Sequence, residues 1–206
     1  MKKIIISLLL MAAAPWAFSQ ELEFGLKAGF SSDNITLHDK GTLDAKVEAN
    51  TTYNFGVYSR FKIVVIGFFI QPELIYNKRA SNFTITDAGQ KYTFSHSASY
   101  MDVPVLFGFK MFKTFRIYGG PNFQFLVGQN TDIPNNVAAF KKMDLTKNTT
   151  GIQLGAGLDL MKFRVDAKYD FNNNSMGSAF EYNGIAPTLK NGMITLQVGI
   201  KLFGIL

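Results

Sequence analysis

Eight segments of this sequence alternate between apolar and polar residues with a period of two. Segment 66–79 reads IGFFIQPELIYNKR, and its Ile70 and Leu74 fall on the opposite face of an extended chain from Glu73. A period of two is typical of a β-strand, because successive side chains point to opposite sides of the backbone. The eight segments are 22–32, 51–61, 66–79, 99–109, 115–128, 149–160, 163–171 and 192–203.

The connections between these segments are alternately long and short. The long ones, 33–50, 80–98, 129–148 and 172–190, are polar and lack a sustained period, whereas the others are a few residues long. Outer-membrane barrels have short turns in the periplasm and long loops outside the cell. A strand of about 10 residues, tilted by about 40°, crosses the apolar band of about 25 Å. The pattern therefore predicts an all-β fold: an eight-stranded antiparallel up-and-down transmembrane β-barrel.

Composition agrees with this class and excludes others. Aromatic residues make up 14% of the chain and charged residues 17%, which is rich in aromatics and poor in charge for a soluble domain. The mean hydropathy of +0.08 is far too low for a bundle of membrane helices. The absence of cysteine excludes disulfides and zinc–cysteine sites. The net charge of +6 comes from dispersed basic residues, so we expect no nucleic-acid partner.

The first 19 residues have the features of a cleaved signal peptide. Lys2 and Lys3 precede a short apolar run, and Ala17-Phe18-Ser19 forms a small-x-small cleavage site. The apolar run is too short to span a bilayer and is followed by Pro15. We therefore expect a signal peptide at 1–19, export from the cytoplasm, and a barrel domain at 20–206.

The two faces of the strands differ in charge. In a transmembrane barrel the apolar face points to lipid and the polar face to the interior. The polar face also carries Glu23. The charged interior residues that we predict are Lys27, Arg60, Glu73, Asp102, Arg116, Asp159, Arg164, Asp166, Lys168, Asp170 and Lys201. Buried charges must be paired, so these residues predict a structural, salt-bridged plug and no wide pore. For Glu73 we expect a cation from Arg60, or from Arg116 one strand further.

Some of these residues are also compatible with a catalytic or metal-binding role. Glu73, Asp166 and Asp170 could be catalytic carboxylates, but Arg164 and Lys168 nearby favour structural ion pairs. His38 and His96 fall in the polar connections, where we expect solvated side chains. We therefore predict no catalytic, cofactor-binding or metal site. The alternative fold is a soluble, lipocalin-like barrel with its apolar face inward.

Six segments resemble one known family in their order and spacing. They are FGLKAGFSSDNI, IQPELIYNKR, SYMDVPVLFGF, RIYGGPNFQFLVG, LGAGLDL and VDAKYDF. Together they resemble the PorT family of Gram-negative outer-membrane barrels across nearly the whole chain after the signal peptide. Two positions depart from the family pattern: Lys168 stands where an arginine is expected, and the terminal aromatic is displaced to Phe203. The resemblance implies a small outer-membrane barrel, and the family's named member is linked to protein secretion.

These features predict a non-enzymatic barrel of the cell outer membrane. We expect contacts with outer-membrane lipid and, during insertion, with the barrel assembly machinery. A protein partner would bind through the long connections 33–50, 80–98, 129–148 and 172–190. The alternatives are a membrane component of a secretion system and, after that, a small channel or a barrel enzyme.

Overall fold

The structure is a computed structural model of the whole chain. It describes residues 20–38, 44–63, 66–87, 90–132, 140–142, 147–172, 180–182 and 188–205. The predicted signal peptide at 1–19 lies outside these residues. In the part of the chain that is described, no helix is long and apolar enough to cross a membrane.

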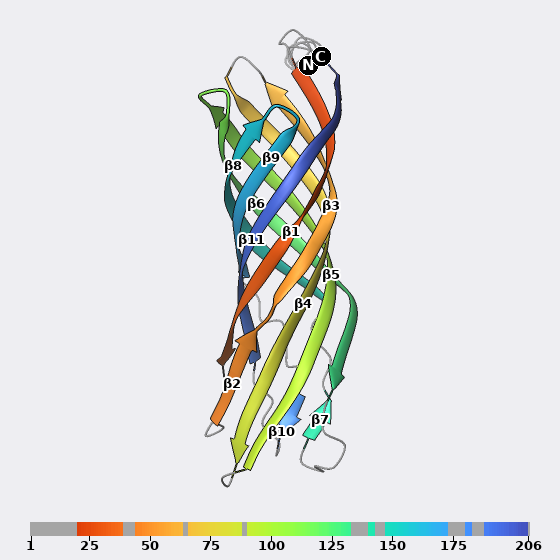
Figure 1. Cartoon of the computed structure of the whole chain (residues 1–206), viewed down its shortest axis with the longest axis vertical. Helices are drawn as coiled ribbons and strands as arrows, with labels where there is room; N and C mark the ends of the chain where they lie inside the picture. The colour runs from red at the N-terminus through yellow and green to blue at the C-terminus, as the bar shows by residue number, and fades with distance from the viewer. Residues whose placement is uncertain are drawn as a thin grey trace, which may run out of the picture.

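Eight long antiparallel strands form a closed barrel (Figure 1). They are β1 (Gln20–His38), β3 (Thr51–Ile63), β4 (Phe68–Asp87), β5 (Gln90–Met111), β6 (Phe115–Asp132), β8 (Asn148–Leu160), β9 (Phe163–Asn172) and β11 (Thr188–Ile205). The strand order around the ring is β4-β3-β1-β11-β9-β8-β6-β5, and pairing of β4 with β5 closes it. The first strand therefore lies beside the last, and the predicted eight-stranded barrel is confirmed.

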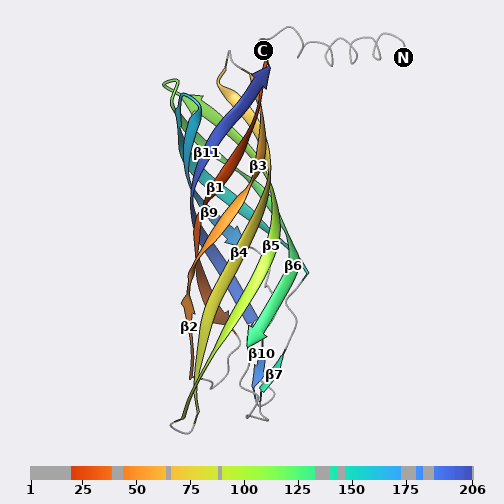
Figure 2. The same ribbon diagram turned by 45° about the vertical axis from the view of Figure 1, so that its right-hand side comes forward.

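The two ends of the barrel differ in the length of their connections. At one end, which we call the short-turn end, β3 leads to β4, β5 to β6 and β8 to β9 within a few residues. β1 begins and β11 ends at this same end, at the top of Figure 1. At the opposite end, the hairpin end, β4 and β5 project as a long hairpin (Figure 2).

The prediction that four long connections lack strand structure is wrong. β1 continues to His38, β4 and β5 pair as far as Asp87 and Gln90, β6 reaches Asp132, and β11 begins at Thr188. Three further short strands occupy parts of the same connections: β2 (Asp44–Ala49), β7 (Phe140–Lys142) and β10 (Phe180–Tyr182). β2 pairs with β4, and β10 pairs with β7. In the extended part of β4 and β5 the outward residues Thr84, Thr86, Thr93 and Ser95 are polar, so the contrast between an apolar and a polar face that predicts a strand is missing there.

The hairpin of β4 and β5 has an apolar inner face. Phe83, Ile85 and Phe94 are at most 3% exposed, and the rings of Phe83 and Phe94 stack with their centroids 5.4 Å apart. His96 is also buried and meets the ring of Phe83 edge-on, so the expectation of a solvated His96 is wrong. His38 ends β1, and its side chain lies outside the described set.

Side chains alternate between the outer and inner surfaces along most of each strand, with register shifts in the β1–β11 and β5–β6 pairs. The outer surface is apolar and exposed, with Phe30, Phe55, Leu74, Leu154, Leu196 and Val198 between 46% and 66% accessible. Polar and charged side chains point inward and are buried. This orientation excludes the lipocalin-like alternative, in which the apolar face would point inward.

Candidate functional site in the barrel interior

The inward faces of the eight strands bring together the charged residues predicted from the sequence. Glu23, Lys27, Arg60, Glu73, Asp102, Arg116, Arg164, Asp166, Lys168 and Asp170 are all buried. Asp159 is nearly covered, with 7% of its side chain accessible, and Lys201 is partly covered at 26%. Charges that are taken out of water must find partners, and the barrel supplies them from several strands.

Glu73 lies at the centre of the interior between two lysines. Its carboxylate accepts hydrogen bonds from Lys27 Nζ of β1 at 2.7 Å and from Lys168 Nζ of β9 at 2.6 Å. Gln71, two residues earlier, donates to the same carboxylate at 2.5 Å. The expected pairing with Arg60 or Arg116 is wrong, because β9 is opposite β4 in the ring and Lys168 reaches Glu73 across the narrow interior.

Asp166 connects Glu73 to the short-turn half of the interior. Lys27 bridges Glu73 and Asp166, with its Nζ 3.0 Å from Asp166 Oδ2. Arg116 and the hydroxyl of Tyr118 donate to Asp166 Oδ1 at 2.9 and 2.7 Å. All of these ionised side chains have 0% accessible surface. The carboxylate of Asp166 is therefore held on both oxygens.

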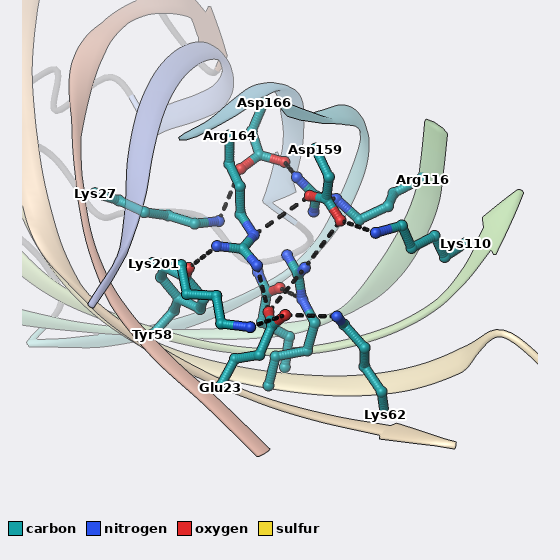
Figure 3. A network of polar contacts seen from close by, with 12 residues as sticks. Glu23, Lys27, Tyr58, Lys62, Lys110, Arg116, Asp159, Arg164, Asp166 and Lys201 are labelled. Carbon is teal, nitrogen blue, oxygen red and sulfur yellow. Dashed lines mark hydrogen bonds and ion pairs between the residues drawn. The ribbon is translucent and has the colours of Figure 1, made fainter. Parts of the chain in front are cut away.

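Two carboxylates near the short-turn end, Glu23 and Asp159, each contact four cations, and Figure 3 shows the network around them. Asp159 lies 2.7 Å from both Arg116 Nε and Lys110 Nζ, and its other two partners are Arg60 and Arg164. Glu23 pairs with Lys62 at 2.5 Å, and Arg164, Arg60 and Lys201 complete its set. Residues from β1, β3, β5, β6, β8, β9 and β11 meet here, so this network joins nearly the whole ring.

A smaller polar network occupies the hairpin half. Asp170 accepts hydrogen bonds from Asn122 at 2.8 Å and from Gln153 at 2.9 and 3.0 Å. Asp102 accepts one from Asn77 at 3.1 Å and lies 3.5 Å from the guanidinium of Arg79. Asp102 is therefore separate from the Glu73 cluster, although the sequence placed both on neighbouring inward faces.

Glycines and aromatic side chains fill the remaining interior. A Cβ at Gly155 would lie 2.5 Å from the ring of Tyr118, so glycine is needed where that ring crosses β8. Phe69, which breaks the polar pattern of its segment, packs inside with Leu106 and Tyr118 and lies under the guanidinium of Arg60. Apolar and charged layers are thus packed against each other.

Some participants were missed from the sequence. We expected Lys62 and Lys110 in the short turns, but each lies one residue before the end of β3 or β5, and their side chains contact Glu23 and Asp159. Glu21, which pairs with Lys62 and Lys201, precedes the first alternating segment. The alternation of the strands could have identified all three residues. Each lies two positions from an inward-facing residue of its own strand, so its side chain also faces inward.

The described residues contain no group of three or more histidine, aspartate or glutamate side chains that could hold a metal ion. Glu73 and Asp166 are each held by two cations within 3.0 Å. Asp170 is held by two amide side chains. This arrangement gives each of these buried carboxylates charged or amide partners, and the Glu73–Lys168 pair ties opposite walls of the barrel together.

The closed eight-stranded ring, its apolar outer surface and its ion-paired interior define an outer-membrane β-barrel. A family model described as "Outer membrane protein beta-barrel domain" matches residues 18–176. The chain belongs to this family, and its place is the outer membrane. No curated protein sequence matches the chain.

Solved structures of outer-membrane proteins have a similar fold. The outer membrane protein OprG of Pseudomonas aeruginosa has a TM-score of 0.54 at 12% identity, over 89% of this chain and 95% of that one. Ail of Yersinia pestis, in complex with a heparin analogue, has a TM-score of 0.48 at 12% identity, over 90% and 100%. Neisserial surface protein A has a TM-score of 0.47 at 11% identity, over 87% and 97%. At these identities the likeness to OprG shows the fold alone.

Proposed function

We propose that the protein is a non-enzymatic, non-conducting barrel whose charged interior is structural and whose long hairpins meet a partner outside the cell. The observation that carries the proposal is the cross-interior pair of Glu73 and Lys168, whose side chains are at most 1% accessible. Together with Lys27 and Asp166, this pair obstructs the middle of the barrel. An eight-stranded barrel has room for side chains in its interior and little else.

Conductance measurements test the closed interior. We expect the wild-type barrel to show no stepwise ionic current in planar lipid bilayers, because ion-paired side chains occupy the path. The double variant Glu73→Ala/Lys168→Ala removes one charge of each sign and should leak small ions, which makes it the positive control. Regular single-channel steps from wild-type protein would overturn the proposal in favour of a small channel.

The proposal places the short-turn end in the periplasm and the hairpin of β4 and β5 outside the cell. The chain has no cysteine, so single cysteines can be introduced without a background signal. Lys91 is exposed on the hairpin and Lys162 is exposed on the turn between β8 and β9. We expect a membrane-impermeant maleimide to label Lys91→Cys but not Lys162→Cys on intact cells. Labelling of Lys162→Cys alone would reverse the orientation.

The resemblance to the PorT family supports the alternative of a component of a secretion system. The two hypotheses differ in whether the barrel is stably bound to other proteins. A secretion component should copurify from mild detergent in a complex of fixed stoichiometry. An independent envelope barrel should elute without one.

A further inference from the structure

The ion-paired network of the barrel interior contains more cations than carboxylates. Among the described residues, its eight cations are Lys27, Arg60, Lys62, Lys110, Arg116, Arg164, Lys168 and Lys201. Its five carboxylates are Glu21, Glu23, Glu73, Asp159 and Asp166. The excess is three positive charges. Arginine does not lose its proton in proteins, so a buried excess of this kind attracts an anion.

The excess lies toward the short-turn end. Three guanidinium groups there share Glu23 and Asp159 with lysines, and among the described residues Arg60 Nη2 and Arg116 Nη1 are buried without a hydrogen-bond acceptor. The hairpin half has the opposite balance, with Asp33, Asp102 and Asp170 against Arg79. The interior is thus positive at one end and negative at the other.

A cavity of about 270 Å³ opens at the positive end. It is lined by Glu21, Lys62, Ile63, Gly67, Lys110 and Lys113. The backbone N–H of Lys110 donates to the carbonyl of Gly67 at 2.8 Å, which ties the two turns of the cavity wall together. The side chains of Lys62 and Lys110 are 12% and 23% accessible, so solvent ions reach them. Figure 3 shows both ammonium groups on the same side of the network.

We propose that this cavity binds a phosphate group through Lys62, Lys110 and Lys113. Lysine ammonium groups act as compact point charges that suit phosphate, and three of them line the cavity against one carboxylate. A phosphate with up to two negative charges offsets more of the excess than a carboxylate does. Because a water molecule takes about 30 Å³, the cavity holds a phosphate together with part of its hydration shell. The group comes from an anionic phospholipid headgroup or from free phosphate.

Binding of inorganic phosphate to the folded barrel in zwitterionic detergent tests the site. Calorimetric titration at constant ionic strength should give saturable binding of one phosphate. Lys113→Gln should weaken it by about threefold to fivefold, the effect of one partly exposed charge. Lys162→Gln, an exposed lysine of another turn at the same end, is the matched control and should leave binding unchanged. Glu21→Gln removes the one carboxylate of the cavity wall and should strengthen binding.

The source of the phosphate group is distinguished by repeating the titration in lipid nanodiscs. If the headgroup is the ligand, phosphatidylglycerol will compete with inorganic phosphate in wild-type protein and less strongly in Lys113→Gln, whereas phosphatidylcholine will compete in neither. If free phosphate is the ligand, both lipids will leave wild-type binding unchanged. Absence of saturable binding, or equal weakening by Lys113→Gln and Lys162→Gln, would overturn the site. This result is independent of the conductance and orientation experiments, so the two proposals fail separately.

Discussion

Replacing Glu73 by alanine is expected to destabilise the barrel by about 3–5 kcal/mol, the usual penalty for breaking a buried ion pair. The variant leaves the ammonium groups of Lys27 and Lys168 without the carboxylate that both contact within 2.7 Å. Lys27 keeps Asp166 as a partner at 3.0 Å, whereas Glu73 is the one carboxylate with which Lys168 is paired among the described residues. The measurement is the urea midpoint of folding into liposomes.

Glu73→Gln is the matched control for this loss. It keeps the shape of the side chain and an oxygen that can accept from one lysine, so it should cost less than Glu73→Ala. If Glu73→Ala is as stable as wild type while a cellular phenotype is lost, the role of Glu73 is functional rather than structural. Equal destabilisation by both variants would mean that neutralising the charge accounts for the whole effect.

Replacing Leu74 by lysine is expected to cost about 2–4 kcal/mol, because a charge then faces the apolar centre of the bilayer. Leu74 is the next residue after Glu73, and its side chain points to the outer surface with 46% of it accessible. The same urea titration in liposomes measures the loss. Adjacent residues of one strand are thus expected to be sensitive for opposite reasons: one to losing a charge and the other to gaining one.

Thr84 provides the matched control on the same strand. Its side chain is on the same outward face of β4 as Leu74, but it lies in the projecting hairpin opposite Thr93. Thr84→Lys should change stability by less than about 0.5 kcal/mol, as surface substitutions usually do. If Thr84→Lys and Leu74→Lys cost the same, the apolar band does not end between these two positions.

The sequence by itself determined the class of fold and the inward or outward direction of most side chains. In a strand this direction depends only on parity, so Leu74 outward and Glu73 inward follow from the order of residues without any knowledge of neighbours. The three short turns also follow from local sequence, because each joins two alternating segments across only a few residues. The period of two, together with the alternation of long and short connections, was therefore enough to predict an eight-stranded outer-membrane barrel.

Local pattern was less informative where the strands leave the apolar band. Phe83 and Ile85 alternate with threonines, yet the polar composition of 80–98 favoured a loop. The register of this hairpin depends on pairing with β5, and β5 supplies Phe94 and His96 to the same inner face. Hydrophobicity detects a strand by its contrast between two faces, and the contrast weakens where the outer face meets water instead of lipid.

Only the tertiary structure decided which charge meets which. Strands that are neighbours in sequence suggested an arginine for Glu73, but closure of the ring placed β9 opposite β4 and brought Lys168 to it. The same closure gathered residues of seven strands around Glu23 and Asp159. The excess of positive charge at the short-turn end exists only in this arrangement. Alternation along a strand decides that a residue faces the interior, but its position along the barrel axis and its partners depend on the register of every strand in the ring.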